Sequence, residues 1–274
     1  AITRFRYPPA GAPLGRHDLS LGAYLAKRRV TDPELQTLSA ARLRVGHVYG
    51  LNEDRQVIQE WSVWRCLAGE FEYDGDTYVL DDGSFYQVDP TYLGALNEQI
   101  CHFTPPITLL PEAPSGMSEK AYNILAVSTS GDFLLLDADE IQFPGARGGI
   151  ELCDILSTSR ALIHVKRYSG SATLSHLFSQ ATASAELLLM NPEFRAAARD
   201  HIQARTNGDP RFAFIDPAAL TSSNFEIVLA IVKDWQGTDI DTLPFFAKVN
   251  LRRALRELGS RGFKASVARV PVAG

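Results

Sequence analysis

Two apolar segments near the middle of the chain carry side chains that could do chemistry. Asp154 lies in IELCDIL (residues 150–156), and His164 and Lys166 lie in ALIHVKRY (residues 161–168). If both segments are strands, side chains two positions apart point to the same face, so His164 and Lys166 share a face. Burial of an unpaired aspartate or lysine is costly. We therefore expect these residues either to be paired for structure or to form a site.

A carboxylate close to a lysine suits the hydrolysis of a phosphodiester bond. A divalent cation such as Mg²⁺ or Mn²⁺, held by oxygen ligands, activates water and stabilises the transition state, and a lysine neutralises charge on the attacked phosphate. Asp154 supplies one ligand oxygen. The others are expected from Glu119 on the preceding helix, from Asp137 at the end of a strand, or from the backbone carbonyl of Val165.

Each of these residues also has a plainer interpretation. Asp154 and Lys166 could form only a cross-strand ion pair, and His164 could be a hydrogen-bonded histidine of the core. A glutamate at a helix start, such as Glu119, is often a surface residue that the helix dipole favours. Alternation along its strand places Glu151 on the opposite, exposed face.

The segment after Lys166 has features of a substrate-binding surface. Arg167 follows directly, and the loop RYSGSA leads into a helix whose free backbone N–H groups favour a phosphate. Ser171 or Thr173 could cap that helix, and His176 and Gln180 lie one turn apart, off its apolar face. These side chains could contact substrate, or they could belong to a solvated helix face.

The surrounding pattern predicts an α/β domain over residues 109–274, preceded by a smaller α+β region over residues 1–108. The segment TPPITLLPEAPSG has four prolines in thirteen positions and marks the boundary. Beyond it the order of elements is α-β-β-β-α-α-β-α-β, which predicts a mixed sheet with helices on both faces. Before it, Asp32 and Pro33 predict a helix start, and two Asp-Gly turns predict a β-meander over residues 57–88.

Composition and charge narrow the class of protein. Of the 274 residues, 45% are hydrophobic and 22% are charged, which is ordinary for a globular protein with a core. No apolar run is long enough to span a bilayer, residues 1–20 lack the features of a signal peptide, and three separated cysteines suit a reducing compartment. We therefore expect a cytoplasmic protein that makes no membrane contact.

Charge is unevenly distributed along the chain. Residues 1–150 carry 12 Lys and Arg against 20 Asp and Glu, whereas residues 151–274 carry 15 against 12. The second part is therefore the better candidate for contact with a polyanion such as nucleic acid.

The order of the charged residues resembles the PD-(D/E)XK nuclease core, and in particular the Mrr-type restriction endonucleases. That core has a helix with a Glu, a strand, a strand with an Asp and a strand with x-x-Lys followed by a helix; the last strand here reads HVKRY. The resemblance implies a restriction-endonuclease-like fold and a metal-dependent nuclease that acts on DNA. It assigns Asp154 to the metal, Lys166 to catalysis and Glu119 to the helix carboxylate, with His164 at the Glu or Gln position as an auxiliary ligand or base.

His164 departs from the pattern of that core, because it removes an oxygen ligand. Imidazole suits manganese, zinc or iron better than magnesium. Either the metal preference shifts, or Glu151 or Asp137 supplies the missing oxygen, or the site is weakened. A weakened site defines the alternative function, a module that binds nucleic acid or senses an invader without cutting.

Residues 109–200 also resemble the C-terminal part of a sporadically distributed bacterial family of uncharacterised proteins, with a nearly continuous match to IELCDILSTSRALIHVKRYSGSATLSHLFSQ. That family accompanies mobile elements and restriction genes, so the resemblance implies a role in antiviral or mobile-element defence. Its members are longer than this chain, and the first residue here is Ala1 rather than Met, so an N-terminal half is expected to be missing. A homodimer is expected because cutting two DNA strands usually takes two sites.

Overall fold

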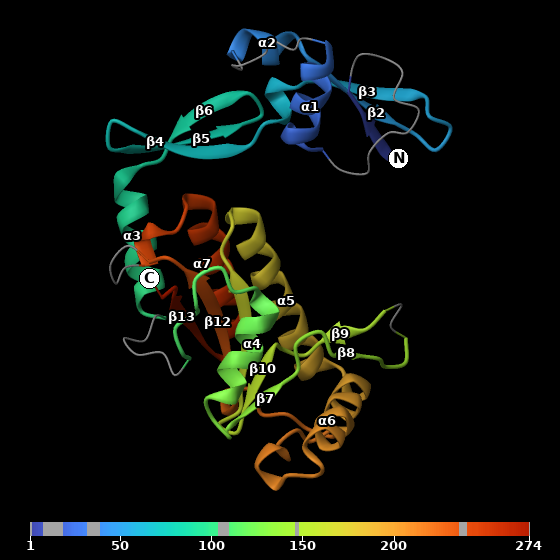
Figure 1. Ribbon diagram of the computed structural model, residues 1–274, viewed down its shortest axis with the longest axis vertical. Helices are drawn as coiled ribbons and strands as arrows, with labels where there is room; N and C mark the ends of the chain where they lie inside the picture. Colours follow the sequence, from blue (N-terminus) through green and yellow to red (C-terminus); the bar gives the residue numbers. More distant parts are fainter. Residues whose placement is uncertain are drawn as a thin grey trace. The chain divides into compact units, whose positions relative to one another are not determined.

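The computed structural model describes residues 2–7, 19–31, 39–103, 110–145, 148–235 and 240–273. The chain divides into two compact units, Ala1–Pro90 and Thr91–Gly274 (Figure 1). This division falls before the predicted boundary at residue 108, because helix α3 (Pro90–Cys101) contributes Leu96 and Ile100 to the core of the larger unit. Residues 104–109 of the predicted Pro-rich linker lie outside the described residues.

The smaller unit contains an antiparallel sheet of three strands in the order β1-β2-β3, with two helices. Its elements are β1 (Arg4–Arg6), α1 (Leu21–Thr31), α2 (Ala40–Val45), β2 (His47–Leu51) and β3 (Val57–Ser62). Helix α2 begins after Ser39, whose side chain accepts a hydrogen bond from the N–H of Arg42. The helix start predicted at Asp32 and Pro33 lies outside the described residues.

A second sheet of this unit is a meander in the order β4-β5-β6. Its strands are β4 (Gly69–Tyr73), β5 (Asp76–Asp81) and β6 (Ser84–Gln87). Both connections are Asp-Gly turns, and Asp74, Gly75, Asp82 and Gly83 all have positive φ. Two consecutive residues with positive φ are the requirement of the tight turns that suit β-hairpins. The predicted meander is therefore confirmed over residues 69–87, whereas Val57–Ser62, which was expected to belong to it, pairs with β2 in the first sheet.

The larger unit is built on a mixed sheet of five strands in the order β13-β12-β11-β10-β7. Its strands are β7 (Phe133–Leu135), β10 (Ile155–Ser157), β11 (Ala161–Arg167), β12 (Glu226–Lys233) and β13 (Lys264–Pro271). Strands β7, β10 and β11 pair antiparallel, and β11, β12 and β13 pair parallel. The predicted α/β class with a mixed sheet is confirmed.

Helices cover both faces of this sheet. The helices of the larger unit are α3, α4 (Glu119–Ser128), α5 (Ser171–Met190), α6 (Pro192–Thr206) and α7 (Phe245–Ser260). On one face, Ile163 and Val165 of β11 pack with Tyr122 and Ala126 of α4. On the other face, Leu162 packs in a larger cluster with apolar residues of α5 and α7. Short 3₁₀ turns occur at Trp64–Cys66, Pro210–Phe212, Ser222–Asn224 and Ile240–Thr242.

Residues 132–143 and residues 150–156 were each predicted to form one strand, and each is broken into two short strands. The outer parts form a separate antiparallel pair, β8 (Glu140–Ile141) and β9 (Ile150–Glu151). Ala138, with a φ of 61°, turns the chain between β7 and β8. The N–H of Leu136 donates a hydrogen bond of 2.8 Å to the carbonyl of Asp154. The inner strands, β7 and β10, therefore stay joined up to Asp154. The sheet therefore opens at Asp154.

Within the described residues, no helix combines the length and the apolar character that crossing a membrane requires.

Candidate active site

Asp154 lies where the chain leaves β9 and enters β10. Its N–H donates to the carbonyl of Ile163 over 3.1 Å, which ties its backbone to β11. Its Oδ2 accepts a hydrogen bond of 2.7 Å from the N–H of Val165. The Asp154 carboxylate therefore takes the place of a backbone carbonyl in the pairing with β11. This accounts for the start of β10 only at Ile155. No other described residue donates a hydrogen bond to the Asp154 side chain, so Oδ1 is available.

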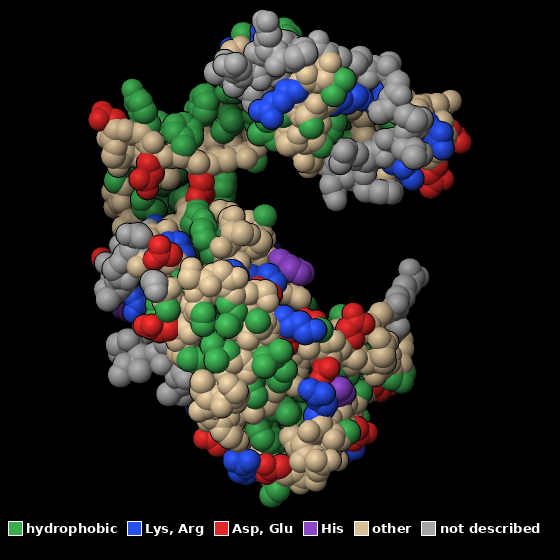
Figure 2. Space-filling model, in the orientation of Figure 1, with side chains coloured by type: hydrophobic (Ala, Val, Ile, Leu, Met, Phe, Trp, Pro, Cys, Tyr) green, Lys and Arg blue, Asp and Glu red, His purple; other side chains and the backbone are tan. Residues whose placement is uncertain are grey.

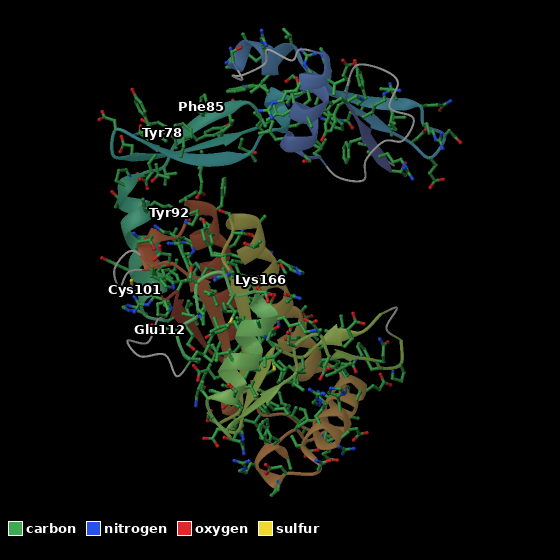
Figure 3. All side chains as sticks on the ribbon, viewed as in Figure 1. Tyr78, Phe85, Tyr92, Cys101, Glu112 and Lys166 are labelled. Atoms are coloured by element: carbon green, nitrogen blue, oxygen red, sulfur yellow. The ribbon has the colours of Figure 1, made fainter. Side chains whose placement is uncertain are left out.

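Lys166 pairs with Glu119 and not with Asp154. Ser118 caps α4 by accepting a hydrogen bond from the N–H of Ala121, which places Glu119 in the first turn. The Nζ of Lys166 lies 2.7 Å from Glu119 Oε1, and the N–H of Arg167 donates to Glu119 Oε2 over 2.8 Å. Figure 3 shows Lys166 beside α4. The cross-strand ion pair of the plainer interpretation is therefore not formed, and Glu119 fixes Lys166 instead.

The pKa of Asp154 depends on its burial and on three neighbouring acids. Burial raises the pKa of Asp154 to about 7, against the opposing effect of the Val165 N–H, and the negative charges of Asp137, Glu151 and Glu119 raise it further. Asp137 has no hydrogen bond or ion pair with any described residue. The neighbouring Asp139, by contrast, contacts two side chains of α6, His201 and Arg205. These contacts span 3.1 and 3.3 Å. The charges of the predicted pair Asp137 and Asp154 therefore interact, although the two side chains share no hydrogen bond.

Glu151 belongs to the same group of charges, although alternation had placed it on an exposed face. It is half-buried, and burial raises its pKa, as do the charges of Asp137 and Glu140. The positive charges of Lys166 and His176 act in the opposite direction. Alternation failed here because the strand breaks between Glu151 and Asp154. The position of Asp154 within the apolar run was noticed, but it was not interpreted as the point where the strand breaks.

His164 is a core histidine in this structure. Its side chain is buried, with Nε2 lying 3.4 Å from the Oγ of Ser184 on α5. Burial lowers its pKa to about 4, so the imidazole is neutral at neutral pH. This geometry favours the plainer interpretation over the predicted role as a base or ligand, because a buried ring has no access to substrate.

Truncation of His164 to alanine is expected to affect stability rather than chemistry. Removing a buried ring of this size should lower the free energy of unfolding by roughly 2–4 kcal/mol, as for other large-to-small core substitutions. Urea denaturation measures this change, and Ser184→Ala, which removes only the hydroxyl, serves as the milder control. An unchanged stability combined with a large loss of any nucleic-acid cleavage would restore a catalytic role to His164.

The predicted substrate-binding residues have mixed outcomes. Arg167 is not free, because its guanidinium donates to the carbonyls of Met117 and Pro114 over 3.1 and 3.5 Å. Ser171 does not cap α5, since Gly170 is the N-cap residue and Ser171 is the first residue of the helix.

The other two predicted substrate contacts, on α5, remain open to a ligand. His176 is exposed and its charge interacts with Glu151. Gln180 is half-buried, and its side chain forms no hydrogen bond with a described residue. Of the predicted surface, His176 is therefore the residue that acts on Glu151.

The acids have the right chemistry for a hard divalent cation, but they do not converge. Asp137, Glu151 and Asp154 offer carboxylate oxygens, which Mg²⁺ and Mn²⁺ accept as ligands. Within the described part of the chain, no three His, Cys, Asp or Glu side chains are close enough to hold an ion in this conformation. A bound cation would require the side chains of Asp137 and Glu151 to turn toward Asp154.

Comparison with known proteins adds a family but no activity. A family model described as "Family of unknown function (DUF6119)" matches residues 1–271. No curated protein and no solved structure matches the chain.

Proposed function

The chain belongs to DUF6119, a family of unknown function, and we propose that it is a metal-dependent nuclease that hydrolyses DNA phosphodiester bonds. One observation carries the proposal. Lys166 is held by Glu119 and its charge acts on Glu151, while Glu151, Asp137 and Glu119 all act on the buried carboxylate of Asp154, at the point where the sheet opens.

Each residue of the group has a role in the proposed reaction. Asp154, with Asp137 and Glu151, would hold a divalent cation, Mg²⁺ or Mn²⁺, which would supply a positive charge and activate water for attack on phosphorus. The Nζ of Lys166 donates hydrogen bonds to the phosphate oxygens and stabilises their negative charge in the transition state. Glu119 positions Lys166, because its two oxygens hold the ammonium group and the following backbone N–H.

The order of the elements supports the comparison with a PD-(D/E)XK nuclease core. Helix α4 carries the Glu, β10 begins next to the Asp, and β11 carries the Lys and leads into α5. The preference for DNA over RNA, the homodimer and the role in antiviral or mobile-element defence are part of the same proposal. A cytoplasmic location agrees with the cysteines of the described residues, Cys66, Cys101 and Cys153, which are free.

A second candidate is a nuclease-like module that binds nucleic acid or senses an invader without cutting it. Two observations favour it. Both oxygens of Glu119 are engaged by Lys166 and Arg167, so this helix carboxylate is not available as a ligand. The described acids also do not converge on one point.

Cleavage assays separate the two candidates. Supercoiled plasmid, single-stranded DNA and RNA are incubated with Mg²⁺, Mn²⁺ or EDTA, and wild type is compared with Asp154→Asn and with Asp200→Asn, a control at an exposed aspartate of α6. The nuclease proposal expects metal-dependent cleavage of DNA that Asp154→Asn abolishes and Asp200→Asn preserves. Retarded migration of DNA without any cleavage supports the binding module. Cleavage that persists in EDTA or in Asp154→Asn contradicts the proposed site.

A further inference from the structure

A row of aromatic side chains crosses the β4–β6 sheet of the smaller unit. The rings of Phe71 and Tyr78 are stacked with centroids 5.5 Å apart, and Phe71 meets Phe85 edge-on at 5.6 Å. Tyr73 extends the row from Tyr78 at 6.4 Å, and Trp64 extends it from Phe85 at 5.6 Å. The row therefore spans all three strands of the sheet.

The row is exposed to an unusual degree for apolar side chains. Tyr73 is 69% exposed, Phe85 55% and Phe71 43%. Figure 3 shows Tyr78 and Phe85 on this sheet, and Figure 2 shows hydrophobic side chains gathered there beside acidic ones. Contiguous exposed apolar surface on a globular protein usually marks a place where another molecule binds.

The pairing of the strands puts these rings on one face. Phe71 is the direct partner of Tyr78, and Phe85 is the partner of Leu80, two residues beyond Tyr78. Side chains of directly paired residues, and of residues two apart, lie on the same face of a sheet. Tyr86, the partner of Val79, lies on the opposite face.

The chain around this row is strongly acidic. Residues 69–87 contain six acids and no Lys or Arg: Glu70, Glu72, Asp74, Asp76, Asp81 and Asp82. A nucleic-acid strand would be repelled by so many carboxylates, although exposed rings alone could stack on bases. By the same alternation, Glu70, Glu72 and Asp81 point to the opposite face, whereas Asp76, the direct partner of Tyr73, lies on the face of the rings. Asp74 and Asp82 lie in the two turns. Exposed rings bordered by these aspartates, in a sheet without a cation of its own in residues 69–87, match a partner that is both planar and positively charged.

The smaller unit already shows how such a cation meets this surface. The guanidinium of Arg44 lies over the ring of Trp64, 5.2 Å from its centroid, at one end of the row. Arg65, the residue after Trp64, forms a bidentate pair with Asp82 through hydrogen bonds of 2.8 and 2.9 Å. A guanidinium can stack on an aromatic ring and bind a carboxylate at the same time, which an ammonium group does less well.

We propose that the aromatic face of the β4–β6 sheet binds an arginine-rich segment of a partner protein. The rings of Phe71, Tyr73, Tyr78 and Phe85 take the guanidinium planes, and the carboxylates of Asp74 and Asp76 beside Tyr73 take their N–H groups. The two outer strands, β4 and β6, each have one edge that pairs with no described strand, so an extended segment could also add main-chain hydrogen bonds there. This proposal does not depend on the nuclease proposal.

Fluorescence anisotropy with the full chain tests the proposal. The probes are fluorescein-labelled peptides of alternating Gly with Arg, Lys or Glu, each with about six charged residues, and a labelled oligo-dT of similar length. The variants are Tyr73→Ser/Phe85→Ser, which breaks the row, and Tyr86→Ser, a matched tyrosine on the other face. The rings replaced are exposed, and circular dichroism verifies that each variant is folded. Asp74→Asn/Asp76→Asn provides a second variant that removes two carboxylates beside Tyr73 and leaves the rings in place.

The proposal expects the arginine peptide to bind more tightly than the lysine peptide, and the glutamate peptide and oligo-dT not to bind at this face. Tyr73→Ser/Phe85→Ser should weaken binding of the arginine peptide at least tenfold. Asp74→Asn/Asp76→Asn should weaken it and make it depend less on salt. Tyr86→Ser should leave it within twofold. Absence of binding to wild type, equal binding by Tyr73→Ser/Phe85→Ser and wild type, or an oligo-dT affinity that depends on Tyr73 and Phe85 would each overturn the proposal.

Discussion

Replacement of Lys166 by methionine is expected to slow DNA cleavage by roughly a hundred- to a thousand-fold, the usual cost of removing one donor that stabilises charge in a transition state. Methionine keeps most of the length of the side chain and removes its charge. The ion pair that is lost joins two partly exposed groups, with 22% and 28% of the side chains accessible, so it contributes at most about 1 kcal/mol to stability. The variant should therefore be folded and slow.

Single-turnover cleavage of plasmid in Mn²⁺ measures this effect. Lys264→Met is the matched control, because Lys264 is an exposed lysine at the start of β13. The parallel register aligns Lys264, through Glu226, with Ala161 at the other end of β11 from Lys166. The control should cut at the wild-type rate. Equal rates for Lys166→Met and Lys264→Met would remove Lys166 from the mechanism.

Replacement of Asp154 by asparagine is expected to stabilise the metal-free protein at pH 8. The pKa of Asp154 is raised from 3.8 to about 7, chiefly by burial. Between these values the unfolded chain has lost the proton and the folded chain still holds it, so stability falls as the pH rises from about 4 to about 7 and stays low above that. Asparagine has no such charge, and its Oδ1 can still accept the hydrogen bond from Val165. The gain at pH 8 should be on the order of 2–4 kcal/mol.

Urea denaturation of wild type and Asp154→Asn in EDTA, between about pH 4.5 and pH 8, measures the gain as a difference. The stability of the variant is compared with that of wild type at each pH because His164 changes the stability of both proteins with pH, in the direction opposite to Asp154. The pKa of His164 is lowered from 6.5 to about 4, so the folded state loses stability as the pH falls through this window. The advantage of Asp154→Asn over wild type should grow with pH. A variant that is less stable than wild type at pH 8 would show that the Asp154 carboxylate is favourably accommodated without a cation.

Most elements of the larger unit could be predicted from their pattern. Helices α5 and α7 carry apolar residues at helical spacing over many turns, and β12 is a continuous apolar run, so burial alone selects the structure. The hairpins of the β4–β6 sheet follow from their Asp-Gly turns, which local backbone energies decide. In each case the information lies within the segment itself.

The candidate site was harder to predict because it depends on contacts between distant segments. Glu119 holds Lys166 across 47 positions of sequence, and nothing near either residue identifies its partner. Glu151 was placed on the wrong face because alternation assumes an unbroken strand. The hydrogen bond from the N–H of Val165 to the Asp154 carboxylate interrupts the strand between Glu151 and Asp154. His164 was assigned to the site by its position in a motif, and its burial against Ser184 shows that position alone does not fix a role.

The central claim is that the acids around Asp154 hold a divalent cation next to Lys166. Calorimetric titration with Mn²⁺ in the absence of DNA tests it most directly, with Asp200→Asn as the control for a general loss of negative charge. The account predicts that wild type and Asp200→Asn bind Mn²⁺ with equal affinity and that Asp154→Asn binds it at least tenfold more weakly. Failure of the wild type to bind Mn²⁺, or equal affinity in Asp154→Asn, would contradict it.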